Sequence, residues 1–153
     1  MTEPFQDDLQ SSLGLDSLSS VKFFTRLQAG SAVLHSKQYK RVSRRNTFTV
    51  AYRSDEHPSL EYGQIEVFFK APVGSRISSG AVVKPLSRSS QCLCKQHEVL
   101  GRPVSHIISL RHPHRHLFVI VPVENIIDVC VYMAFSDSEV HYAAHFPNHL
   151  ERD

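Results

Sequence analysis

Residues 37–45 gather five cations in nine positions, and this density is the first chemical signal in the sequence. The cations are Lys37, Lys40, Arg41, Arg44 and Arg45, with Tyr39 among them. Lysine and arginine neutralise phosphate groups, and an aromatic ring between them can stack on a base. Two interpretations stay open: a surface that binds an acidic partner or a DNA or RNA backbone, and a solvated loop between two strands.

Tyrosines at strand-like positions are the second candidate site, because aromatic rings can enclose a methylated lysine. The candidates for this aromatic cage are Tyr52, Tyr62 and Tyr132. The chain has no tryptophan, the ring that binds cations best, and this counts against a cage. The simpler alternative is that rings such as Phe48 and Phe68 belong to the core.

Ten histidines and three cysteines raise the question of a metal. The groups close in sequence are Cys92, Cys94 and His97, and His112, His114 and His116. The Cys-x-Cys spacing is not that of a zinc knuckle, and no second pair follows it. We therefore expect no metal and no cofactor. No glycine elbow or oxyanion loop accompanies a Cys–His pair, so we expect no enzymatic activity.

The net charge of +2 conceals blocks of opposite sign. Residues 1–20 sum to −4 without a base, whereas residues 21–53 sum to +8 without an acid. The composition, 41% hydrophobic and 21% charged, is that of a globular protein. No apolar run reaches the ~20 residues that span a bilayer. The few cysteines suit a reducing compartment, so we expect an intracellular protein without a membrane partner.

Short β-strands must position these residues, because apolar and polar residues alternate in several segments. Residues 47–53 and 126–135 alternate clearly. Residues 23–28 and 31–36 predict a hairpin, and Gly63 suggests a bulge within a strand over 60–69. We expect residues 71–102 to be mostly loop, with one short strand near Cys92. The predicted domains are an acidic, flexible tail (1–20), one mostly β, barrel-like domain (21–149) and a short tail (150–153).

Four short motifs carry a family resemblance: His35-Ser36, Tyr39-Lys40-Arg41, Arg45-Asn46-Thr47 and Tyr62-Gly63-Gln64-Ile65. In this order they resemble the C-terminal accessory region of CACTA-type transposases and of transposon-derived animal proteins. The resemblance covers roughly residues 21–149 and implies a small antiparallel barrel, BAH-like or SH3-like, with long loops. Such modules bind protein or chromatin. A nuclease domain does not fit in this length.

The expected function is therefore that of a non-enzymatic, transposon-derived interaction module whose partner is protein or chromatin. A chromatin partner would place the protein in the nucleus. The alternative is a module that binds nucleic acid without sequence specificity through residues 37–45. The oligomeric state stays open.

Overall fold

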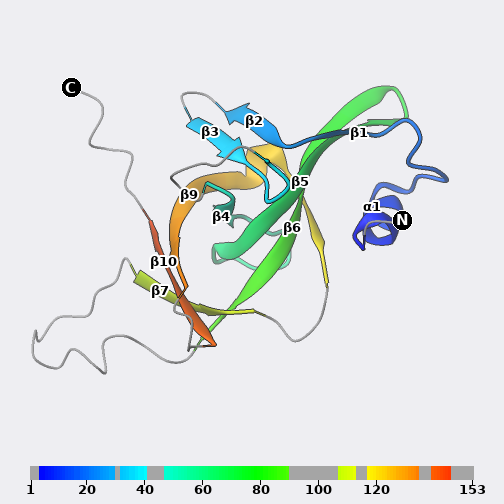
Figure 1. Cartoon of the computed structure of the whole chain (residues 1–153). Coiled ribbons are helices and arrows are strands. Elements are labelled where there is room, and N and C mark those ends of the chain that lie inside the picture. The colour runs from blue at the N-terminus through cyan, green and yellow to red at the C-terminus, as the bar shows by residue number, and fades with distance from the viewer. Residues whose placement is uncertain are drawn as a thin grey trace, which may run out of the picture.

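The computed structural model describes residues 4–29, 32–40, 47–89, 107–112, 117–134 and 139–145. Antiparallel strands dominate this part of the chain, which confirms the predicted mostly β class (Figure 1). The elements are α1 (Gln6–Leu13), β1 (Lys22–Phe24), β2 (Arg26–Ala29), β3 (Ala32–His35), β4 (Thr49–Tyr52), β5 (Glu61–Val73), β6 (Arg76–Arg88), β7 (Ile107–Arg111), β8 (Val119–Pro122), the 3₁₀ turn η3 (Val123–Asn125), β9 (Ile126–Met133) and β10 (Val140–His145). None of the helical segments described has the length and hydrophobicity that a membrane crossing requires.

Eight of the strands form one sheet in the order β1-β5-β4-β9-β10-β7-β6-β8, and β5 also pairs with β6. The pairings from β5 through β4, β9, β10, β7 and β6 therefore return to their starting strand, and the ribbon curves accordingly (Figure 1). β1 and β8 extend the sheet beyond this cycle, one along β5 and one along β6. The predicted hairpin is present as β2 paired with β3.

The long hairpin of β5 and β6 corrects the expectation of a loop over residues 71–102. β5 continues to Val73, and β6 runs over 13 residues from Arg76. Pro85 is tolerated because it lies between the part of β6 that pairs with β8 and the part that pairs with β7. Gly74 closes the hairpin at φ 60°. Residues 90–106, with the strand expected near Cys92, lie outside the described residues.

Gly63 is required for close packing rather than for a bulge. A Cβ atom at this position would collide with Val83 Cγ1 and lie 2.9 Å from the carbonyl oxygen of Lys84. The break in the β5–β6 register falls instead between Ile65 and Val67. Glycine is therefore what lets β6 approach β5.

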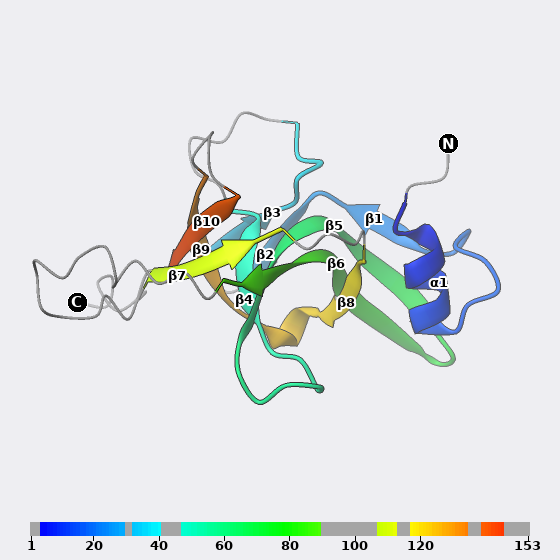
Figure 2. The same cartoon turned by 90° about the horizontal axis from the view of Figure 1, so that it is seen from below.

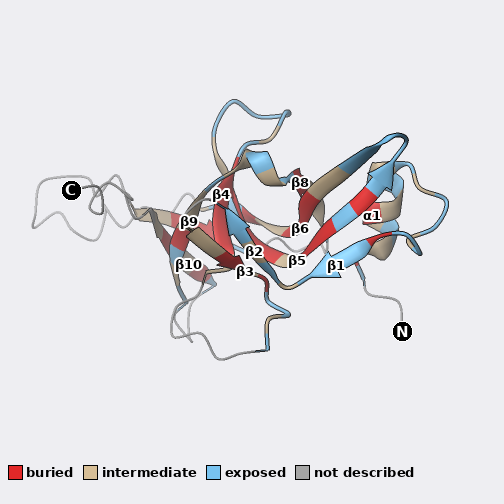
Figure 3. Ribbon diagram, turned by 90° about the horizontal axis from the view of Figure 1, so that it is seen from above, coloured by how far each residue is buried: buried red, intermediate tan, exposed pale blue. Residues whose placement is uncertain are grey.

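Buried side chains of the described residues form three clusters, and the central strands are the most buried part of the ribbon (Figure 3). The first includes Val50, Tyr52 and Ile65, and Leu27 and Leu34 of the β2–β3 hairpin pack on it. The second lies beneath α1, and the third joins β4, β5, β6, β7, β9 and β10. All four residues of β4 are buried because its two faces serve different clusters.

The N-terminal segment corrects the expectation of a flexible tail. Phe5 and Leu9 are 4% and 0% exposed and belong to the second cluster, and α1 packs beside β8 (Figure 2). Phe5, Leu9 and Leu13 are four residues apart, so they share one face of a helix. Gly14 ends the helix in the left-handed conformation at φ 62°. Burial of this apolar face therefore fixes the segment against the sheet, although the segment is acidic in composition.

Candidate binding groove

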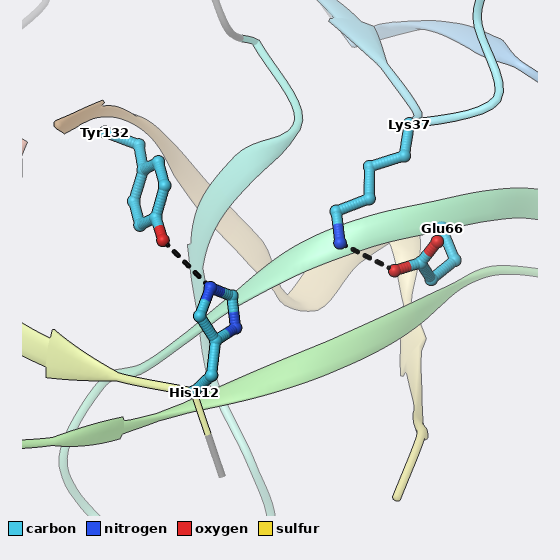
Figure 4. A network of polar contacts seen from close by, with 4 residues as sticks. All are labelled: Lys37, Glu66, His112 and Tyr132. Carbon is cyan, nitrogen blue, oxygen red and sulfur yellow. Dashed lines mark hydrogen bonds and ion pairs between the residues drawn. The ribbon is translucent and has the colours of Figure 1, made fainter. Parts of the chain in front are cut away.

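The basic segment after β3 is partly neutralised by its surroundings. Lys37 Nζ lies 2.9 Å from Glu66 Oε1, as Figure 4 shows. The Tyr39 ring stacks on His35 with 4.2 Å between the ring centroids, so one face of this ring is occupied. Lys40 is exposed. Arg41, Arg44 and Arg45 lie outside the described residues, and their place relative to Lys37 stays a prediction.

His35 anchors this segment to the strand that follows. Its Nδ1 lies 2.6 Å from Thr47 Oγ1. Burial, and after it the charge of Arg26, lowers the pKa of His35 below its usual value. The neutral imidazole is therefore the form that suits the folded state.

The three tyrosines of the expected cage do not come together. Tyr52 belongs to the first cluster, whereas Tyr62 and Tyr132 belong to the third, on the other side of β4 and β5. Tyr52 pairs with Glu61, so its neighbour Tyr62 points to the opposite face. The Arg88 guanidinium lies 5.4 Å from the centroid of the Tyr62 ring. Strand alternation therefore places Tyr52 in a different cluster from the other two rings, and only Tyr52 and Tyr62 line a common hollow, without Tyr132.

Tyr132 instead joins two histidines. Its hydroxyl lies 2.7 Å from His141 Nδ1 and 3.1 Å from His112 Nε2 (Figure 4 shows the second contact). Burial, and after it the nearby His141 and lysine charges, lowers the pKa of His112. Within the described ranges, no three His, Cys, Asp or Glu side chains are arranged to hold a metal. His114, His116, Cys94 and His97 lie outside these ranges.

Cys130 lies inside the third cluster and is 0% exposed. Burial, and after it the charge of Asp128, raises the pKa of this thiol to about 12. The thiol is therefore protonated at neutral pH and is a poor nucleophile.

A hollow on the described surface runs along β8 and has a volume of about 440 Å³. Its lining includes five consecutive residues, 118–122. Because successive side chains of a strand point to opposite faces, a hollow that touches all five lies along the edge of the strand. β6 occupies the other edge of β8, and no other described strand pairs with β8. The hollow is therefore a groove beside an edge of β8 that no described strand occupies.

The backbone of Ile120 faces this groove. The carbonyl oxygen of Val121 lies 2.9 Å from the Cβ position of Gly80, so the peptide groups of Val121 face β6. Backbone groups of neighbouring residues in an antiparallel strand point to opposite edges, so the N–H and C=O of Ile120 face the groove. Pro122, which has no N–H, occupies the next outward-facing position. Ile120 thus offers a donor and an acceptor to a further strand.

The walls of the groove carry mainly negative charge. α1 contributes one wall, and the segment after β4 contributes the other. The charged lining residues are Asp8, Asp55, Glu56, Glu61 and Arg53. Four carboxylates against one guanidinium favour a cationic ligand. Asp8 is brought to the others only by the docking of α1, so no contiguous acidic run in the sequence marks the groove.

A second hollow of about 370 Å³ lies next to the groove, and Tyr52 and Glu61 line both. His57 and Arg88 belong to this second hollow, and His57 Nε2 lies 3.5 Å from Glu61 Oε1. Tyr52 and Glu61 face each other as cross-strand partners on β4 and β5. The two hollows therefore meet at one tyrosine–glutamate pair.

The chain matches no protein-family model, no curated protein and no solved structure. The likeness to CACTA-type transposases accordingly stays a resemblance of short motifs. The function is therefore inferred from the geometry and charge of the groove.

Proposed function

We propose that the protein is a non-enzymatic interaction module that binds an extended, basic segment of a partner protein along the edge of β8. The observation that carries this proposal is the groove itself, in which an unpaired strand edge lies between acidic walls. A bound segment would pair its backbone with Ile120 and present lysine or arginine side chains to the carboxylates. Addition of a strand to an exposed sheet edge is an established mode of peptide recognition.

The resemblance to transposon-derived modules supports the same class of function. We propose that the cycle of pairings among β4, β5, β6, β7, β9 and β10 is the small barrel that this resemblance implies, of the BAH-like or SH3-like kind. Chromatin proteins contain extended segments rich in lysine and arginine, so chromatin is the partner class that suits an acidic groove. A partner of this class would place the protein in the nucleus.

Sequence-nonspecific binding of nucleic acid through residues 37–45 is the alternative proposal. The exposed Lys40 supports it, whereas the ion pair between Lys37 and Glu66 reduces the charge available to phosphate. The groove proposal is stronger because it rests on a described cavity with both a shape and a charge.

Binding of a labelled peptide of alternating lysine and threonine residues tests the proposal. Its lysines share one face when the peptide is extended. Reversing two exposed groove charges, with Asp55→Lys and Glu56→Lys together, should weaken binding by about tenfold or more. The control is the pair Asp16→Lys and Glu139→Lys, which changes the net charge equally at exposed positions outside the groove lining. This control should change affinity by less than about threefold.

Amide hydrogen exchange provides the second measurement. The bound peptide should slow exchange of the Ile120 N–H, because a carbonyl oxygen of the added strand would accept its hydrogen bond. Equal weakening by both charge-reversal pairs, with no protection of Ile120, would rule out the groove. Retention on DNA or heparin that is lost with Lys40→Glu, in a protein that does not bind the peptide, would favour the alternative.

A further inference from the structure

The turn between β5 and β6 presents an apolar hairpin tip, formed by Pro72, Val73 and Ile77. Val73 is 38% exposed and Ile77 is 76% exposed, and Pro72 is exposed beside them. The two strands pair as far as Val73 and Arg76, so pairing holds these side chains at the outer end of the sheet (Figure 3). Single exposed apolar residues are common, whereas a group of them marks a surface that contacts another molecule.

Strand register places part of the hairpin tip on the face of the sheet opposite α1. Ala71 is buried in the second cluster beneath α1, so Lys70 and Pro72 point to the other face. Pro72 pairs with Ile77, and directly paired residues share a face. The β2–β3 hairpin packs on this face as far as Phe68, which belongs to the first cluster. Beyond it, the side chains of Lys70, Pro72 and Ile77 are exposed.

Positive charge lies directly behind the hairpin tip. Lys70 pairs with Lys22 of β1, so two exposed lysines stand side by side on this face. Lys70 Nζ lies 5.8 Å from the centroid of the Phe24 ring, a contact that holds the ammonium on this face. Lys70 precedes Pro72 by two strand residues, which puts these charges roughly 7 Å behind the tip. Arg76 adds an exposed charge at the turn itself. Lys22, Lys70 and Arg76 together form a basic row.

No carboxylate belongs to the strands that build this surface. Residues 17–29 and 67–88, which include β1, the hairpin tip and the basic row, contain neither Asp nor Glu. Asp7 and Asp8 belong to α1, which covers the opposite face. The carbonyl of Asp16 accepts a hydrogen bond from Gln10, so this residue is also tied to α1. The surface therefore combines exposed aliphatic groups with positive charge that no neighbour on these strands neutralises.

The combination restricts the class of partner. A second copy of the chain would bring two basic rows together, and like charges repel. Single-stranded nucleic acid would suit the lysines, but its bases stack on aromatic rings rather than on valine or isoleucine. An anionic lipid bilayer offers hydrocarbon to the hairpin tip and negative head groups to the basic row.

We propose that the hairpin tip docks the protein on the surface of an anionic lipid bilayer. Pro72, Val73 and Ile77 enter the boundary between head groups and acyl chains, a layer about 5–10 Å deep, and the basic row contacts the head groups. The expectation of no membrane partner came from the absence of an apolar run of ~20 residues, which spanning requires and surface docking does not. These residues line neither hollow, so the inference is independent of the groove.

Sedimentation of the full chain with unilamellar vesicles tests the inference. The protein should bind vesicles that contain phosphatidylserine at least about tenfold more tightly than vesicles of phosphatidylcholine alone. Ile77→Glu should weaken binding to the anionic vesicles by about tenfold or more, because a charge replaces the inserted side chain. The matched control is Ile127→Glu, which changes an exposed isoleucine of β9 in the same way. This control should bind within about threefold of the original protein.

Reversal of the basic row separates local charge from net charge. Lys70→Glu together with Arg76→Glu should weaken binding to anionic vesicles by about tenfold or more at low salt. The control pair, Lys40→Glu with Arg111→Glu, changes the net charge equally at exposed positions outside this surface. It should weaken binding by less than about threefold. Equal losses in the two pairs would overturn the hairpin tip as the docking site.

Fluorescence locates the residue that enters the bilayer. The chain contains no tryptophan, so Ile77→Trp supplies one probe at the hairpin tip and Ile127→Trp supplies one on β9. Anionic vesicles should shift the emission of the first variant to shorter wavelength and leave that of the second unchanged, because only the hairpin tip leaves water. Sedimentation without this shift, or an equal shift in both variants, would overturn insertion of the tip.

The remaining outcomes also decide the inference. Absence of binding to anionic vesicles would overturn it, and peptide binding to the groove would be unaffected. A shift of the Ile77→Trp emission with a single-stranded oligonucleotide but not with vesicles would overturn it in favour of nucleic acid. A shift that grows with protein concentration, without vesicles or oligonucleotide, would overturn it in favour of a second copy of the chain.

Discussion

The groove beside β8 and the basic segment after β3 carry opposite charges and are assembled in opposite ways. The basic segment is contiguous in sequence, and its described part is engaged by neighbours: Lys37 pairs with Glu66, and Tyr39 stacks on His35. The groove draws its carboxylates from α1, from the segment after β4 and from β5. Among the described residues, these carboxylates surround a cavity, whereas the basic segment lines neither hollow.

A dense run of like charge in the sequence is therefore a weaker sign of a binding site than charges that folding brings together. Adjacent cations repel one another, and nearby carboxylates or aromatic rings reduce the free charge that they present. Core packing holds carboxylates from separate elements close together, although they repel one another. A cationic ligand relieves that repulsion.

The substitution Leu9→Ala should have the largest effect on stability. It removes a core contact that holds α1, and α1 forms one wall of the groove. Leu9 is fully buried on the inner face of α1, so the substitution should lower the free energy of unfolding by about 2–5 kcal/mol. Denaturant titration measures it. The control is Asp7→Ala on the exposed side of α1, which should cost no more than about 1 kcal/mol. Equal, small losses in both variants would return residues 1–20 to the flexible tail that their acidic composition suggested.

A smaller effect should appear on the basic side when the pH falls. Burial lowers the pKa of His35 in the folded protein below the usual histidine value of about 6.5, so folding favours the neutral ring. Its contribution to stability is therefore complete above about pH 6.5 and is lost as the pH falls through the lower, folded pKa. One proton changes the unfolding equilibrium constant by at most about tenfold per pH unit. Urea unfolding of His35→Gln between pH 7 and 5 should show a shallower dependence; parallel curves would contradict the assignment.

The smallest effect should come from the ion pair that ties the basic segment to β5. The side chains of Lys37 and Glu66 are 30% and 19% exposed, so water screens their attraction. A double-mutant cycle with Lys37→Met and Glu66→Gln should give a coupling of about 0.2–1 kcal/mol. A coupling near zero would mean that Lys37 is free for an acidic ligand, which would strengthen the basic segment as a competing site.

The sequence predicted the kind of element well wherever alternation was strong. Residues 47–53 and 126–135 contain β4 and β9, and the hairpin predicted from residues 23–28 and 31–36 is present as β2 and β3. The loop prediction over residues 71–102 was wrong up to Arg88, because proline and glycine were taken as breaks. In the folded sheet, Pro85 lies where β6 changes partner and Gly80 lies against the ring of Phe69, so neither interrupts pairing. The residues of a strand do not indicate which other strands it will pair with.

The candidate site was predicted less well, for the same reason. The spacing of Phe5, Leu9 and Leu13 was the one signal that could have placed α1 against the sheet, and the acidic composition concealed it. Tyr52 was singled out as an aromatic ring, but its place beside Glu61 follows from the β4–β5 register. Nothing local to Asp8 or Asp55 indicates that they face a common groove.

The mostly β class and the alternation of the strands could be predicted from the residues alone, because side-chain direction along a strand is a local property of the backbone. The tertiary structure decided which face of each strand lies inside. In β9, Cys130 is buried while Ile127, Val131 and Met133 are partly exposed, although hydrophobicity alone favours the reverse. It also decided which charges meet. These outcomes depend on contacts between residues distant in sequence, and it is these contacts that build the acidic groove beside β8.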